Sequence, residues 1–83
     1  MANALEISAA DKYFVGLLAI KEGHGEILVR PETGNDKRFR VRDDTIIIRN
    51  GKKVTFNELR ARDHLQIRYE SSREAIEIVA NGS

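Results

Sequence analysis

Apolar and polar side chains alternate along most of this chain, most clearly between Phe39 and Val79. A period of two is typical of strands that bury one face, because successive side chains of a strand point to opposite sides. Turn residues separate the alternating segments at short and regular intervals, as in small all-β barrels. The expected strands are Tyr13–Ile20, Glu26–Arg30, Lys37–Arg42, Thr45–Arg49, His64–Tyr69 and Glu74–Val79, with a brief return strand at Lys52–Val54.

The same alternation predicts which side chains face the barrel interior. They are Phe39, Val41, Leu65, Ile67, Tyr69, Ile76 and Ile78. The segment Tyr13–Ile20 is apolar at every position and has no polar face. Such a segment suits either a strand that bends at Gly16 or a strand that another element covers on its outer side.

Turn signals complete the expected topology. Asn50-Gly51 is suited to a type I′ turn, in which both central residues need positive φ. Thr55 and Glu58 have the spacing of a capping box, which predicts one helical turn over Phe56–Arg60. That turn is expected to place Phe56 and Leu59 on the open end of the barrel. We therefore predict an all-β fold, a small antiparallel barrel of five to six strands (OB/SH3-like) with one short helical turn.

The chain length indicates a single domain. Eighty-three residues bury roughly 60% of the surface that the unfolded chain exposes. We expect an N-terminal arm at residues 1–12, the barrel at 13–80 and a tail at 81–83. The apolar run at Tyr13–Ile20 is much shorter than the about 20 residues that a membrane helix needs. The first residues lack the basic and apolar regions of a signal peptide, which predicts a cytoplasmic protein as the chain stands, or an exported one if a leader was removed.

The fold-determining positions carry a family resemblance. They are Phe39, Val41, Thr45, Ile46, Asn50-Gly51, Val54, Leu59, Asp63, Leu65, Ile67, Tyr69, Ala75 and Ile78. With this set the chain resembles small bacterial β-barrel domains of unknown function, which often occur in exported or envelope proteins and are similar in shape to OB-folds and to periplasmic CusF-type barrels. Those domains start the strand after the helix with a Gly-Asp step, where this chain has Arg62-Asp63. The resemblance implies architecture and not function.

Metal binding is not predicted. The copper site that the CusF-type resemblance implies uses methionine sulfurs and a histidine beneath a tryptophan, but this chain has no tryptophan and its one methionine is Met1. Glu22, His24 and Glu26 are spaced as possible zinc ligands. Zinc usually takes three or four protein ligands, and the Gly-His-Gly step is foremost a hairpin turn, so we predict a turn and no cofactor.

Catalysis is not predicted either. The chain has no cysteine and no glycine-rich phosphate loop, and Ser71 and Ser72 fall in an expected tight turn. A barrel of this size is filled by its own side chains, which leaves no enclosed cleft for a small-molecule substrate.

Arginines are the one candidate surface feature. Arg38, Arg40 and Arg42 alternate with Phe39 and Val41 and must share the outer face of their strand, and Arg68 lies on a strand expected nearby. The net charge is only +1, and outward glutamates are expected to neutralise much of this face. We therefore predict a non-catalytic structural or protein-interaction module, with a protein partner or a larger parent protein. The alternative is an OB-like single-stranded nucleic-acid-binding protein that uses these four arginines.

Overall fold

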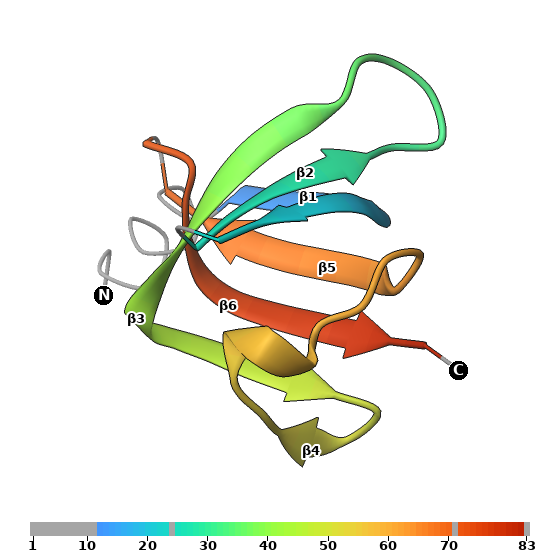
Figure 1. The fold of residues 1–83 in the computed structure, drawn as a ribbon. Coiled ribbons are helices and arrows are strands. Elements are labelled where there is room, and N and C mark those ends of the chain that lie inside the picture. The colour runs from blue at the N-terminus through green and yellow to red at the C-terminus, as the bar shows by residue number, and fades with distance from the viewer. Residues whose placement is uncertain (1–11, 24, 71, 83) are drawn as a thin grey trace, which may run out of the picture.

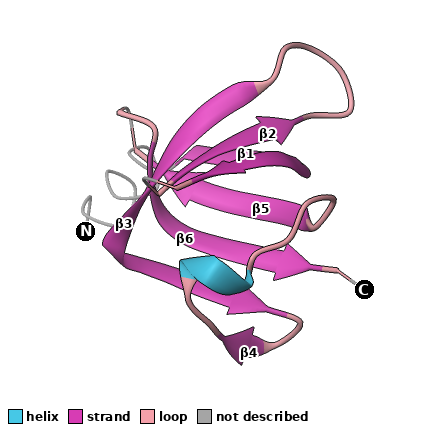
Figure 2. Cartoon of the chain, viewed as in Figure 1, coloured by secondary structure: helices cyan, strands magenta, loops and turns pink. Residues whose placement is uncertain are grey.

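The computed structural model describes residues 12–23, 25–70 and 72–82. The expected arm lies outside the described residues except for Lys12, which begins the first strand. The elements are β1 (Lys12–Glu22), β2 (Glu26–Arg30), β3 (Lys37–Arg49), β4 (Lys52–Lys53), the 3₁₀ turn η1 (Phe56–Glu58), β5 (His64–Tyr69) and β6 (Glu74–Asn81). Strands dominate the fold in Figure 2, which confirms the all-β class.

Five strands close into a barrel. Going around it, β1 pairs with β2, β2 with β3, β3 with β6, β6 with β5, and β5 with β1 (Figure 1). The short strand β4 adds to β3 outside the closed ring. The predicted barrel of five to six strands is therefore confirmed.

One pairing differs from the expected antiparallel barrel. β3 and β6 run parallel, whereas every other pair is antiparallel. Parallel neighbours need a long crossover connection, and the chain between them supplies one through β4, η1 and β5. Alternation of apolar and polar residues reports which face of a strand is buried but not the direction of its neighbour.

β3 is one long strand where two were expected. Asp43 and Asp44 do not form a turn; the strand bends there and continues (Figure 1). Its register against β6 shifts between Val41 and Ile46. The hydroxyl of Thr45 spans this irregular stretch: it accepts a hydrogen bond from the Arg42 amide at 2.8 Å and donates one to the Ala75 carbonyl at 2.7 Å. Thr45 therefore provides partners for backbone groups that regular strand pairing would otherwise satisfy.

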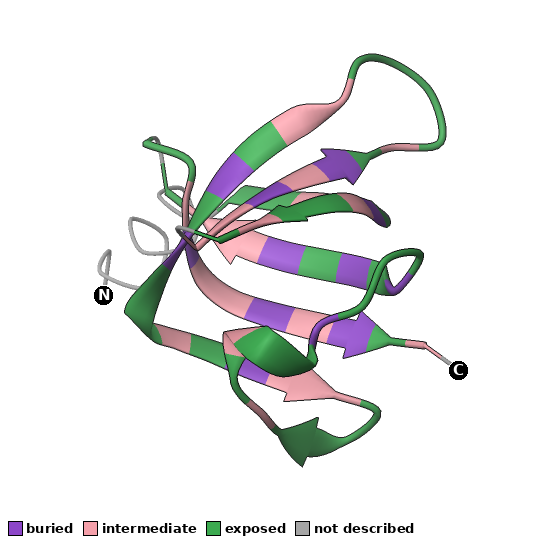
Figure 3. Ribbon diagram, viewed as in Figure 1, coloured by how far each residue is buried: buried purple, intermediate pink, exposed green. Residues whose placement is uncertain are grey.

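Buried residues alternate with exposed or partly buried ones along the strands (Figure 3), and the buried apolar residues form the hydrophobic core. They are Leu18, Ile27, Val29, Phe39, Val41, Ile47, Leu59, Leu65, Ile67, Ala75, Ile78 and Ala80. Phe39 lies among the aromatic side chains, with its ring centroid 5.3 Å from that of Phe14 and 4.9 Å from that of Tyr69. The inward positions predicted on β3 and β5 are confirmed, although Tyr69 is only partly buried.

The prediction for Ile76 is wrong. Ala75 is fully buried in its place and Ile76 is only partly buried. The cause is a bulge, because Arg68 pairs with Glu77 but the next residue, Tyr69, pairs with Ala75. The unpaired extra residue reverses the inward and outward positions on either side of it.

The backbone of β2 approaches Gly16 of β1 closely. A Cβ atom at this position would lie 2.5 Å from the carbonyl oxygen of Arg30. This close approach accounts for a glycine inside an otherwise large-residue strand. The outward side chains of Tyr13 and Val15 are exposed, so no described element covers this face of β1.

The helical turn is shorter than predicted and is held differently. η1 ends at Glu58, and Thr55 makes no side-chain capping bond, so the predicted capping box is wrong. Instead the ammonium group of Lys21 donates to the carbonyls of Phe56 (3.3 Å), Asn57 (3.0 Å) and Leu59 (2.7 Å). Leu59 is buried as predicted, whereas Phe56 is only partly buried. No helix in the described part of the chain has the length and apolar character needed to cross a membrane.

Candidate functional site

Three of the four predicted arginines share one surface. Arg38, Arg40 and Arg42 are exposed on the outer face of β3 and alternate with the buried Phe39 and Val41. Arg68 does not join them. It lies on β5, which is separated from β3 by β6 on one side and by β1 and β2 on the other.

Carboxylates lie beside each of the three β3 arginines. Arg38 contacts Glu22 at 2.8 Å and Glu26 at 3.5 Å, Arg40 contacts Glu26 at 3.6 Å, and Arg42 contacts Glu74 at 3.4 Å and Asp44 at 3.7 Å. The hydrogen bond to Glu22 raises the pKa of Arg38 above its ordinary value, so this side chain stays charged. Cross-strand pairs of opposite charge are the usual way to stabilise a solvated sheet. Their carboxylates also cancel much of the positive field that a nucleic acid would meet.

Two of the possible zinc ligands, Glu22 and Glu26, face Arg38. His24, the third, lies outside the described residues. Within residues 12–23, 25–70 and 72–82, no three histidine, aspartate or glutamate side chains gather as metal ligands.

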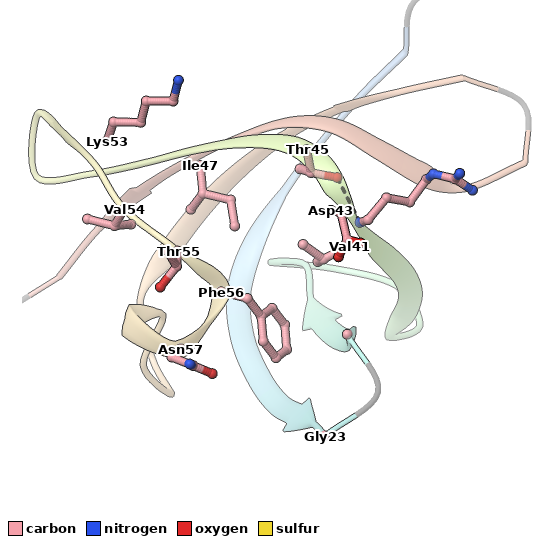
Figure 4. Close-up of a pocket in the computed structure, with 12 residues that line it drawn as sticks. Gly23, Val41, Asp43, Thr45, Ile47, Lys53, Val54, Thr55, Phe56 and Asn57 are labelled. Atoms are coloured by element: carbon pink, nitrogen blue, oxygen red, sulfur yellow. Dashed lines mark hydrogen bonds between the residues drawn. The ribbon is translucent and has the colours of Figure 1, made fainter.

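A cleft of about 630 Å³ opens beside the bend of β3. It lies between the β1–β2 connection, the middle of β3 and the segment from β4 to η1 (Figure 4). Its apolar lining comes from Val41, Ile47, Val54 and Phe56, and its polar lining from Arg42, Asp43, Thr45, Lys53, Thr55 and Asn57. The sequence pattern did not predict this site, because Lys37–Arg42 and Thr45–Arg49 were expected to be two separate strands.

The ring of Phe56, which lines the cleft, is contacted by Lys21. The Lys21 ammonium lies 5.3 Å from the centroid of its ring while donating to the carbonyls of η1. A cation over an aromatic face is attracted by the ring quadrupole. The partly buried ring is therefore fixed in place, with Val41 and Ile47 lining the same space (Figure 4).

The outer face of β1 is apolar and exposed. Tyr13 is 58% exposed, Val15 61%, Leu17 37% and Ile20 50%. We call these four residues the β1 outer face. The β5 residues paired with its first three members are polar: Arg68, Gln66 and His64. In the sequence, this face was indicated by the segment Tyr13–Ile20, which is apolar at every position. The structure shows that the outward side of this strand is not covered by any other described part of the chain.

A buried ion pair lies at the other end of β3. The Asp63 carboxylate, in a residue 2% exposed, accepts hydrogen bonds from Arg49 at 2.8 and 2.9 Å and from the Arg60 amide at 3.0 Å. The bond from Arg49 and, secondarily, the bond from the Arg60 amide lower the pKa of Asp63 despite its burial. Because the carboxylate is well satisfied by these donors, we assign the pair a structural role.

Comparison of the chain with protein-family models, with curated proteins and with solved structures finds no match.

Proposed function

We propose that this chain is a non-catalytic β-barrel module that binds another protein through the β1 outer face. The observation that supports this proposal is the row of exposed apolar side chains on that face. Single exposed hydrophobic residues are normal, but a contiguous row rimmed by polar side chains is typical of interaction surfaces. The first residue of the row, Tyr13, is consistent with a protein interface, because aromatic residues are enriched in such interfaces.

The geometry of β1 supports the same proposal. Tyr13, Val15 and Leu17 project from alternate positions of one strand in a closed barrel, so they form a rigid strip that need not rearrange on binding. Preorganised apolar contacts lose less conformational entropy when a partner docks. The resemblance to small bacterial barrel domains, OB-folds and CusF-type barrels is compatible with this proposal at the level of shape, and copper binding is no part of it.

Site-specific photo-crosslinking tests the proposed interface. A photoreactive amino acid replaces Val15 in one variant and Lys52, an exposed residue of β4, in a matched control. In native extract we expect a discrete crosslinked protein from position 15 and none from position 52. Adding Leu17→Glu to the first variant is expected to abolish the crosslink, because a charge would then be buried in the interface. Equal crosslinking from both positions, or none from position 15, would contradict the proposal.

The alternative function is single-stranded nucleic-acid binding by an OB-like barrel. One observation favours it: Arg38, Arg40 and Arg42 do project together from β3. The adjacent carboxylates and the net charge of +1 argue against it, because affinity for nucleic acid rests largely on neutralising phosphates.

A fluorescence titration with mixed single-stranded DNA and RNA decides between the two functions. We expect negligible binding at physiological salt, and changes in the free energy of unfolding below about 0.5 kcal/mol for each arginine replaced by glutamine. Micromolar binding that weakens steeply with salt and disappears in the triple variant Arg38→Gln/Arg40→Gln/Arg42→Gln would establish the alternative instead.

A further inference from the structure

The edge of β3 that faces β2 and β4 is interrupted. On this edge β2 pairs with β3 only as far as Arg40, and the Val41 amide then donates to the carbonyl of Gly25. Pairing resumes at Ile47, whose carbonyl accepts from the Val54 amide at 2.9 Å, and continues into β4. In the described part of the chain, no strand pairs with residues 42–46 on this edge.

An unpaired strand edge is a template for another strand. The gap of five residues spans at most about 16 Å, the length of the same number of residues in an extended strand. The cleft of about 630 Å³ lies directly along this gap, since Val41, Asp43, Thr45 and Ile47 all line it. This edge therefore offers unpaired backbone groups beside an open volume.

From this arrangement we propose that the cleft binds an extended peptide segment of a partner protein, which adds to the β3 edge as a strand. Strand addition takes its affinity from main-chain hydrogen bonds and its specificity from pockets for alternate side chains. The apolar lining of Val41, Ile47, Val54 and Phe56 provides such a pocket. This site uses different strands from the β1 outer face and does not depend on it.

Two charged side chains that line the cleft indicate which residues the bound peptide carries. Asp43 and Lys53 are exposed, and neither forms an ion pair within the described residues. Lys53 lies in register with Ile48, so the two charges lie at different positions along β3, on either side of the bend. Arg42 also lines the cleft, but Asp44 and Glu74 lie close to its guanidinium group. The complementary peptide therefore carries a basic residue near Asp43, an acidic residue near Lys53 and an apolar residue between them.

Selection from a phage-displayed library of random heptapeptides tests the proposal on the full chain. Wild-type protein is expected to enrich peptides with an apolar centre between a basic and an acidic residue, in one consistent order. The exchange variant Asp43→Lys/Lys53→Asp is expected to enrich the opposite order. Lys52→Glu, next to the cleft but not lining it, is the matched control and is expected to select as wild type does. Unfolding midpoints of all variants verify that each is folded.

A second measurement isolates the strand addition. The best enriched peptide is resynthesised with N-methyl groups on alternate residues, which remove every other main-chain donor. In one of the two methylation phases we expect affinity, measured by fluorescence anisotropy, to fall at least tenfold, because only alternate residues point their amides toward β3. No enrichment, an order that does not reverse in the exchange variant, or equal affinity of the methylated and unmethylated peptides would overturn the proposal. Val15→Glu is expected to leave peptide binding unchanged, because Val15 does not line the cleft, so failure of this proposal can be distinguished from failure of the crosslinking experiment.

Discussion

Replacing Phe39 with alanine is expected to lower the free energy of unfolding by about 3–5 kcal/mol, the range for buried aromatic residues. Phe39 is 1% exposed and lies between the rings of Phe14 and Tyr69. Its loss removes a large buried surface and leaves a cavity that the closed barrel cannot easily collapse around. Urea denaturation followed by circular dichroism measures the change, which is a large share of the stability of a domain this small.

Phe56→Ala is the control for this prediction. The sequence predicted that Phe56 and Leu59 cover the open end of the barrel. The Phe56 side chain is only partly buried, so we expect its replacement to lower the free energy of unfolding much less than Phe39→Ala does. An equal loss for the two variants would show that residue type and not burial determines the effect.

Asp63→Ala is expected to have the second large effect. It should lower the free energy of unfolding by about 3 kcal/mol, as is typical when one partner of a buried ion pair is removed. The substitution removes the carboxylate that accepts two hydrogen bonds from Arg49, whose side chain is 13% exposed. It also removes the acceptor of the Arg60 amide. Asp36→Ala, which breaks the exposed pair with Arg30, is the matched control and is expected to change the free energy of unfolding by at most about 1 kcal/mol. Similar losses in both variants would contradict the structural importance of burial at Asp63.

The pH dependence of stability gives an independent check on Asp63. Its folded-state pKa is lowered, chiefly by the hydrogen bond from Arg49. A lowered pKa means that the unfolded state binds the proton more readily, so the stabilisation is fully present above the unfolded pKa, about 3.9. It is lost as the pH falls through the lower folded pKa. As the pH falls from about 5 through the folded-state pKa of Asp63, the free energy of unfolding of Asp63→Asn is expected to decrease less than that of wild type. The same decrease in both proteins would contradict a lowered pKa at Asp63.

The three arginines on the outer face of β3 show how much structure a local sequence pattern can predict. Alternation with Phe39 and Val41 was enough to place Arg38, Arg40 and Arg42 on one surface, because a strand has only two faces. Their ion pairs with Glu22, Glu26 and Glu74 depend on which strands adjoin β3. The separation of Arg68 from this group depends on the order of strands around the barrel.

The candidate peptide cleft was not predictable from the same signals. Asp43 and Asp44 are common turn residues, and nothing local distinguishes a turn from a bend inside a continuous strand. At the bend, the Thr45 hydroxyl bonds both Arg42 and Ala75, and Ala75 is distant in the sequence. The partial exposure of Ile76 was also not predictable from the local pattern, because it results from a bulge in the pairing of β6 with β5.

Local signals in the sequence by themselves determined the fold class, the approximate strands and most of the core, because period-two alternation and turn residues act within a few positions of each other. Tertiary structure alone decided the parallel pairing of β3 with β6, the support of η1 by Lys21 instead of Thr55, and the open edge beside the cleft. Each of these depends on contacts between residues far apart in the chain, and a local pattern carries no information about such partners.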